Sequence, residues 1–417
     1  TAFFKLLSCS SLALLVLAAP GLDEADPPAC DGSAGDAYEV SSSKLLQAKA
    51  SRQRSGASVG QEEETEAEEA LEEQAAAWAA QGTRVENLKG ARILIHNESD
   101  VAQTGTGQWL IIIPEGCTNE DVHQMAEHMP HGATADFEGS PDEGGLCTFV
   151  MTGTEEQVRE ELTTHTWPSP PIVESVVTWR FIDEIGTVEE DKDPSLLQQA
   201  TPPSWGIDRV DDRQGLDQDY SPAFTGKGIH VYVADTGIRT THRDFGGRAI
   251  PTLEVLSSRR KVCSASDTSC AFDKQGHGTH CAGTVGGASY GVAKEATLHA
   301  VKVLSDNGGG SFSWFVEAID WVLTDGVKPA VFSASLGGKG VLDSVKTAID
   351  SAVKGGVTVV VAAGNDGRSR EPDACKYSPA YVPSAITVGS TQKGDSRSSF
   401  SSYGSCLDIY APGSDIE

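Results

Sequence analysis

From Gly228 onward, short apolar segments rich in β-branched residues alternate with segments of helical character. Strands of this composition are typically buried on both faces, and their regular alternation with helices indicates a doubly wound α/β domain with a parallel sheet. In such sheets, functional residues gather where the strands end at their carboxyl side. The expected strands are residues 229–234, 298–303, 330–335, 357–362 and 385–389, and the expected helices are residues 279–284, 312–324 and 342–354.

Three polar residues stand at the ends of these elements. Asp235 follows the first expected strand, His277 lies 42 residues further on in a glycine-rich run, and Asn365 follows the fourth strand. Acyl transfer uses a carboxylate that fixes the tautomer of a histidine, a histidine that takes a proton from a nucleophile, and an amide that donates to an oxyanion. The pattern therefore predicts an acyl-transfer site. A zinc site at His277 and His280 is the weaker alternative, because the His-Glu-x-x-His pattern is absent.

The sequence around these residues resembles the subtilisin superfamily, and within it the proteinase K branch. Residues 276–286 read Gly-His-Gly-Thr-His-Cys-Ala-Gly-Thr-Val-Gly and are the most specific match. The Asp-Thr-Gly triplet at 235–237 also occurs in aspartic proteases, but those need a second triplet, and the sequence has none. The resemblance runs from about Trp205 to the end of the chain. The other matching segments are residues 233–238, 290–294, 301–304, 333–338, 361–365, 377–380 and 398–401.

This resemblance implies a serine endopeptidase that acts on polypeptides. Asp235 would be the triad acid, His277 the general base and Asn365 the oxyanion donor. Two main-chain stretches would bind the substrate as an added strand, and glycines there let a peptide approach the backbone closely. Small residues along the second stretch indicate an open, apolar specificity pocket. The two stretches are Gly308, Gly309 and Gly310, and Ser335, Leu336 and Gly337.

The resemblance also implies a structural calcium ion and one disulfide. The carboxylate of Asp408 and main-chain oxygens near Pro383 and Ala385 match a family calcium site, and hard oxygen ligands of this kind suit calcium. Relatives in this branch often carry a disulfide at the positions of Cys375 and Cys406. Two further pairs, Cys263 with Cys270 and Cys117 with Cys147, are expected to form locally, which leaves Cys30 over.

Residues 105–188 form a smaller unit of different character. The expected order of strand, helix, short strand, strand, helix and long final strand suits a small α+β domain of split βαβ type. The order, length and position resemble the inhibitory propeptide of the family, which implies that the protease binds its own propeptide. The maturation cut is expected at 189–202. The strands are expected at 109–114, 134–137, 146–151 and 172–185, and the helices at 120–129 and 154–165.

The front of the chain is acidic and has the features of a secreted protein. Residues 1–199 carry 11 Lys and Arg against 36 Asp and Glu, which argues against nucleic acid or an anionic membrane as partner. Residues 1–19 have the basic start, short apolar run and small residues of a signal peptide, and no other stretch is long enough to span a bilayer. Residues 20–104 read as an acidic, low-complexity leader. We expect a secreted monomer.

The family nucleophile occupies a Gly-Thr-Ser-x-Ala context after the segment Ala411-Pro-Gly413, and no serine of this sequence has that context. The resemblance thus implies that the peptidase domain, residues 200–417, is incomplete and that its serine lies beyond Glu417. The alternative function is a non-catalytic secreted binding protein with the same scaffold, and the intact Asp235, His277 and Asn365 argue against it. A propeptide-like inhibitor fused to a protease remnant is a third hypothesis.

Overall fold

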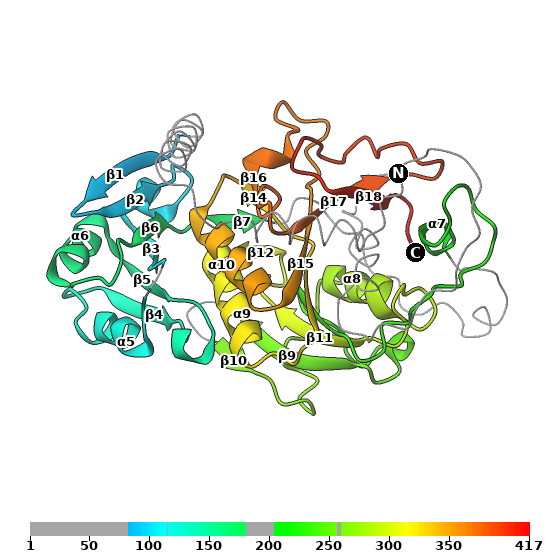
Figure 1. Ribbon diagram of the computed structural model, residues 1–417, viewed down its shortest axis with the longest axis horizontal. Helices are drawn as coiled ribbons and strands as arrows, with labels where there is room; N and C mark the ends of the chain where they lie inside the picture. The colour runs from blue at the N-terminus through cyan, green and yellow to red at the C-terminus, as the bar shows by residue number, and fades with distance from the viewer. Residues whose placement is uncertain (1–81, 115, 181–203, 257–259) are drawn as a thin grey trace, which may run out of the picture.

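The computed structural model describes residues 82–114, 116–180, 204–256 and 260–417, which form two units packed side by side (Figure 1). The small unit is drawn in blue to blue-green, and the peptidase unit in green to red. The expected signal peptide, most of the expected leader and the expected cleavage segment at 189–202 lie outside the described residues. Within the described ranges, no helix is long and apolar enough to cross a membrane.

The small unit is built on a six-stranded sheet with the strand order β1-β2-β6-β3-β5-β4. All neighbouring strands are antiparallel except β2 and β6. Helices α5 and α6 both begin with a capping box, at Thr118 and Thr154, which satisfies free N–H groups of the first turn. The elements are β1 (Arg84–Leu88), β2 (Ala91–Ile95), α4 (Asp100–Thr104), β3 (Thr106–Ile112), α5 (Asn119–Glu127), β4 (Thr134–Glu138), β5 (Thr148–Thr154), α6 (Glu155–Thr164) and β6 (Ile172–Ser175).

The folded part begins earlier than the sequence pattern indicated. The expected leader, residues 20–104, contains β1, β2 and α4, which belong to the sheet of the small unit. Ile93 and Leu94 of β2 are fully buried. The acidic composition of the preceding segment hid the short apolar run Ala91–Ile95, because a five-residue strand contributes little to the average over a long window.

The two faces of the small sheet pack against different partners. Trp109, Ile111 and Phe149 point to the face covered by α5 and α6, where they join Val122 and Val158 in one core. Because side chains alternate along a strand, the neighbouring residues of β3 and β5 point the other way. They join the peptidase-unit core that also contains residues of α9 and α10, the helices that lie between the two sheets in Figure 1.

The peptidase unit is the expected doubly wound α/β domain. Its eight-stranded sheet has the order β10-β9-β11-β8-β13-β15-β17-β18 and is parallel except for the pair β9 and β10. The principal elements are α7 (Trp205–Val210), β8 (His230–Asp235), β9 (Ala249–Val255), β10 (Arg260–Val262), α8 (His277–Gly286), β11 (Thr297–Lys302), β12 (Gly309–Ser311), α9 (Phe312–Thr324), β13 (Ala330–Ala334), α10 (Asp343–Lys354), β15 (Val357–Ala362), β17 (Ile386–Thr391) and β18 (Ile409–Pro412).

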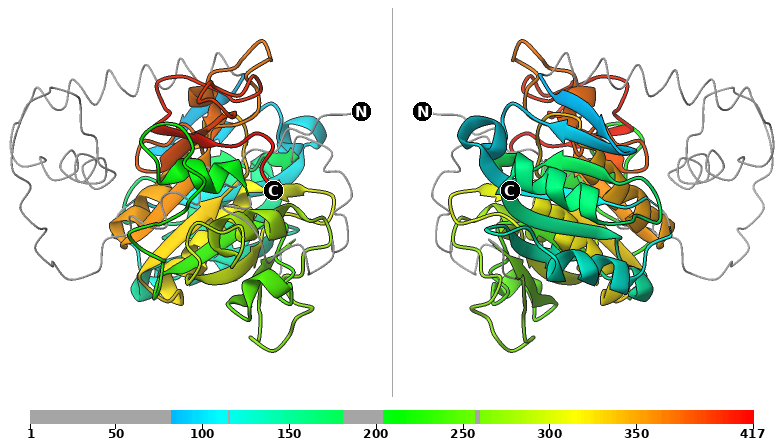
Figure 2. Two further views of the ribbon diagram at one scale, coloured as in Figure 1. Left: turned by 90° about the vertical axis from the view of Figure 1, so that its right-hand side faces the viewer. Right: turned by 90° about the vertical axis from the view of Figure 1, so that its left-hand side faces the viewer.

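Helices cover both faces of this sheet. Val285 of α8 packs with Val231 and Val233 on one face, while Phe315 of α9 and Val345 of α10 pack on the other. Figure 1 shows α9 and α10 on one side of the sheet and α8 on the other, and in the two views of Figure 2 these layers lie one behind another. The elements that carry the candidate site residues thus meet at the carboxyl edge of the parallel strands.

The prediction of one long final strand at 172–185 is wrong. Strand β6 ends at Ser175, and after Val176 and Val177 the chain forms a separate short strand, β7 (Thr178–Arg180). Strand β7 leaves the small sheet and pairs with β12 of the peptidase unit. Residues 172–180 read as one strand in the sequence because β6 and β7 are both extended and rich in apolar residues. The residues between them do not indicate that β7 pairs with a different sheet.

Candidate active site

A buried hydrogen-bonded pair joins the two secondary-structure elements that carry Asp235 and His277. Asp235 is the last residue of β8, and His277 is the first residue of α8. The Nδ1 atom of His277 lies 2.7 Å from Oδ1 and 2.8 Å from Oδ2 of Asp235, and both side chains are fully buried. The carboxylate can therefore hold the ring in the tautomer that carries a proton on Nδ1 and leaves Nε2 to accept one.

A second buried carboxylate, Asp273, connects the turn after Asp235 to the helix that carries His277. Its Oδ1 accepts from Thr236 Oγ1 at 2.9 Å and from the N–H of Gly276 at 2.8 Å. Its Oδ2 accepts from the N–H and the hydroxyl of Thr279. The sequence reasoning missed Asp273, although an aspartate just before a helix start is a common capping signal.

Asn365 lies near this pair, beyond the end of β15. It lines a hollow together with Ser335, Leu336 and Gly337, which follow the neighbouring strand β13. Leu304 also lines the hollow, and its N–H donates to the main-chain oxygen of Asp235. Among the described residues, neither amide atom of Asn365 has a hydrogen-bond partner. Buried polar atoms are usually paired, so this amide is available to a bound group.

The expected substrate-binding stretch at 308–310 holds a strand of the small unit. Gly309 and Gly310 pair in antiparallel register with Arg180 and Trp179 of β7. Gly308 has a φ of 79° and makes the turn that leads into β12. A Cβ atom on Gly310 would lie 2.4 Å from Trp179 Nε1, so glycine is required for this close approach.

Trp179 reaches from the small unit into the hollow of the peptidase unit. Its side chain is only 4% exposed and lines the same hollow as Asn365. The indole ring lies 4.1 Å from the ring of Phe312 and 6.1 Å from the ring of Phe315, between ring centroids. A large aromatic side chain in this position excludes any other chain segment from the same place.

One hydrogen bond links Asp408 of the expected calcium site to the strand that follows Pro383 and Ala385. The carboxylate of Asp408 accepts from the N–H of Thr387 at 2.9 Å, at the end of the segment that contains Pro383 and Ala385. A carboxylate beside a run of main-chain carbonyl groups is the donor set that calcium prefers. A separate group of carboxylates, Asp208, Asp212 and Asp217, was not singled out from the sequence. Asp208 there accepts from main-chain N–H groups of the same loop.

Three disulfides match the pairs that we expected from the sequence. They join Cys117 to Cys147, Cys263 to Cys270, and Cys375 to Cys406. The last pair ties the segment after the Asn365 loop to the start of β18. Cys30 lies outside the described residues.

Comparisons with known proteins identify the family. Residues 226–416 match the subtilase family, peptidase S8. The chain is 47% identical over 233 residues to an extracellular serine proteinase from Thermus sp. (strain Rt41A), covering 56% of this chain and 53% of that protein. It is 35% identical over 341 residues to subtilisin-like protease 3 from Trichophyton equinum, covering 78% of each.

Two further matches cover the peptidase unit. Alkaline serine exoprotease A from Vibrio alginolyticus is 44% identical over 237 residues, covering 55% of this chain and 42% of that protein. The crystal structure of a cold adapted subtilisin-like serine proteinase is 44% identical, with a TM-score of 0.46, and covers 51% of this chain and 73% of that chain. The chain spans about half the length of the Thermus and Vibrio proteins. It belongs to the subtilase family.

Proposed function

We propose that the protein is a secreted serine endopeptidase that is made as an inhibited precursor. The observation that carries the catalytic part is the buried pair of Asp235 and His277, 2.7 Å apart, beside a hollow lined by Ser335, Gly337 and Asn365. Relatives named as extracellular proteinases support both the reaction and the compartment. The fitting substrates are polypeptides, which can add a strand to β12.

In this proposal each residue has a separate role. His277 Nε2 takes the proton of a serine hydroxyl as that oxygen attacks the peptide carbonyl, and later gives it to the leaving amine. Asp235 keeps the ring oriented and stabilises the imidazolium. The amide of Asn365 donates to the oxyanion, an interaction that is typically worth about 10²–10³-fold in kcat.

Hydrolysis of a blocked chromogenic peptide tests the reaction type. The full-length protein, with the serine expected beyond Glu417, is expected to release the amine, and a serine-directed phosphonate is expected to stop the reaction. Hydrolysis that survives the phosphonate but not a chelator would point to a metal-dependent peptidase and would contradict the proposal.

The small unit would act as the built-in inhibitor. Support comes from β7, which occupies the substrate position on β12, and from Trp179, which lines the hollow beside Asn365. An inhibitor that binds as an added strand blocks the same main-chain groups that a substrate needs. The protein would therefore gain activity only when the small unit is released, and the segment expected to be cut, residues 189–202, follows β7 in the chain.

Calcium would be held by Asp408 and by main-chain oxygens near Pro383 and Ala385. There it would tie the loop before β17 to the start of β18 and supply stability rather than chemistry. At a calcium concentration of about 100 times Kd, removal is expected to cost ~2.7 kcal/mol and to lower Tm by about 5–10 °C.

Thermal unfolding with and without a chelator measures this effect. The Asp408→Asn variant is expected to lose the response to the chelator, while Asp415→Asn, an exposed aspartate in the same region, is expected to keep it. A chelator response that is unchanged in Asp408→Asn would place the ion elsewhere.

A further inference from the structure

The face of the peptidase unit that receives the small unit is unusually rich in buried carboxyl groups. We define the α9–α10 face by three residues, Glu317 and Asp320 on α9 and Asp343 on α10. Each of them is at most 5% exposed. Glu174 of the small unit adds a fourth buried carboxyl group, at 2% exposure. Burial of an ionised carboxylate is costly unless it is paired, so the pairing of each group decides how it behaves.

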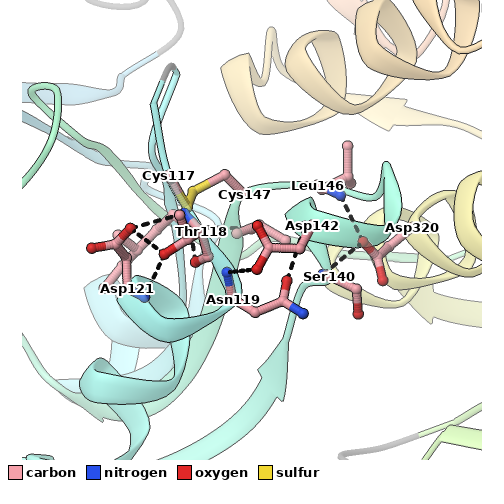
Figure 3. The surroundings of a disulfide bond; sticks show 11 residues. Cys117, Thr118, Asn119, Asp121, Ser140, Asp142, Leu146, Cys147 and Asp320 are labelled. Carbon is pink, nitrogen blue, oxygen red and sulfur yellow. Dashed lines mark hydrogen bonds between the residues drawn. A yellow bond between two sulfur atoms is a disulfide. The ribbon is translucent and has the colours of Figure 1, made fainter.

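Asp320 is covered directly by the small unit. Its Oδ1 atom accepts from the N–H of Leu146 at 2.7 Å and from the N–H of Ser140 at 3.3 Å, in the loop beside the disulfide of Cys117 and Cys147 (Figure 3). The other oxygen, Oδ2, has no hydrogen-bond partner among the described residues. Arg260 Nη1 lies 3.6 Å from it, and burial raises the pKa of Asp320.

Glu317 stands one turn earlier on α9. It faces Arg260 at 3.9 Å, with Asp320 and Asp136 of the small unit as its acidic neighbours. Burial is the main cause that raises the pKa of Glu317 to about 7; the charge of Arg260 opposes this and is too distant to outweigh it. Arg260 thus lies close to two buried carboxyl groups, those of Glu317 and Asp320.

The α10 end of the face contains two buried carboxyl groups whose pKa values shift in opposite directions. Glu174 accepts from the N–H groups of Asp343 and Ser344 and from His96, and these bonds lower its pKa against the opposing effect of burial. Burial and the nearby charge of Glu174 raise the pKa of Asp343 to about 6, although Arg92 pairs with it. Lys346 and His96 are the other charged groups that act on Asp343.

We propose that the α9–α10 face binds the small unit with uptake of protons, so that the inhibitory contact is tightest in acid and loosens as the pH rises to neutrality. The proposal rests on the proposed role of the small unit as inhibitor and adds its regulation. When the small unit leaves, the carboxyl groups of the face meet water and return toward their ordinary range, in which they are ionised above about pH 4.5.

The direction of the pH effect follows from the thermodynamic linkage between proton binding and docking of the small unit. A carboxyl group whose pKa is higher in the docked state favours docking fully below its free pKa, and this contribution is lost as the pH rises through the docked value. For Glu317 the window runs from the ordinary value of 4.5 to about 7. Docking should therefore weaken on the order of 10- to 100-fold between pH 5 and pH 8.

Hydrogen exchange on the full chain measures docking without needing catalysis. The amides of β12 are protected by β7, so their opening constant, corrected for intrinsic exchange, reports release of the small unit. Peptides from β8 and β11 serve as the reference for a folded peptidase unit. In the parent, the opening constant of β12 is expected to rise about 10- to 100-fold from pH 5 to pH 8, while the reference peptides stay protected.

Neutral isosteres test which groups are responsible. Glu317→Gln, alone and with Asp343→Asn, is expected to keep β12 protected at pH 8 and to flatten the pH profile. Glu295→Gln, which removes an exposed carboxylate elsewhere on the peptidase unit, is expected to behave like the parent. A parent profile without pH dependence, or variants that retain the parent profile, would overturn the proposal while leaving the inhibitor role intact. Unprotected β12 amides at every pH would overturn both.

Discussion

Replacing Asp235 with Asn is expected to lower kcat for peptide hydrolysis by about 10⁴-fold, with little change in folding. Both carboxylate oxygens of Asp235 lie within 2.8 Å of His277 Nδ1. An amide of the same shape can turn its NH₂ group toward the ring, so the ring then carries its proton on Nε2 and no longer accepts one from the nucleophile. Steady-state kinetics with a chromogenic peptide measure the loss.

The matched control is Asp267→Asn, in the surface loop that the disulfide of Cys263 and Cys270 closes. It removes the same charge far from His277 and is expected to keep kcat within about twofold. If Asp235→Asn lowers kcat no more than the control does, the pair has a structural role and Asp235 is not the triad acid.

Replacing Trp179 with Ala is expected to release the inhibition by about 30-fold or more. Buried tryptophans at the centre of an interface are typically worth 2 kcal/mol or more when truncated, which is about 30-fold in an equilibrium constant. Trp179 packs against Phe312 with the two rings tilted, and it is almost fully buried between the two units. The measurement is the peptidase activity of the uncut protein, compared with the parent at the same pH.

Trp167→Ala provides the control for a general loss of stability in the small unit. Trp167 packs against the core under α5 and α6 and does not line the hollow. The Trp167→Ala variant is expected to have a less stable small unit, without a comparable rise in peptidase activity. Equal activation by both variants would mean that unfolding of the small unit, rather than loss of the Trp179 contact, relieves the inhibition.

Much of the peptidase unit could be predicted from the sequence because its strands and helices are determined by residues that are close together in the chain. The buried parallel strands are short β-branched runs, and helix α9 begins and ends where the pattern indicated, at Phe312 and Thr324. The positions of Asp235 and His277 followed from strand ends and a glycine-rich motif. The pairing of Cys263 with Cys270 and of Cys117 with Cys147 was expected from the sequence, and that of Cys375 with Cys406 was implied by the family resemblance.

The contacts between the units could not be predicted in the same way. That β7 leaves its own sheet for β12 depends on a partner more than a hundred residues away, and neither strand has a signal for the other. Strands β1 and β2 were missed because they are brief and follow a long acidic segment. Asp273 and Asp320 are ordinary aspartates in sequence, and only the fold shows that one supports the site and the other receives the small unit.

Mass spectrometry of the intact protein, in the parent and in His277→Ala, tests the central claim most directly. The account holds that the full-length protein, with the nucleophile serine expected beyond Glu417, is a peptidase that cuts off its own inhibitory unit. The parent is therefore expected to be cut within residues 189–202, the His277→Ala variant to stay whole, and His242→Ala, a histidine without a catalytic role, to be cut like the parent. A parent that stays whole, or a His277→Ala variant that is cut at the same place and rate, would contradict it.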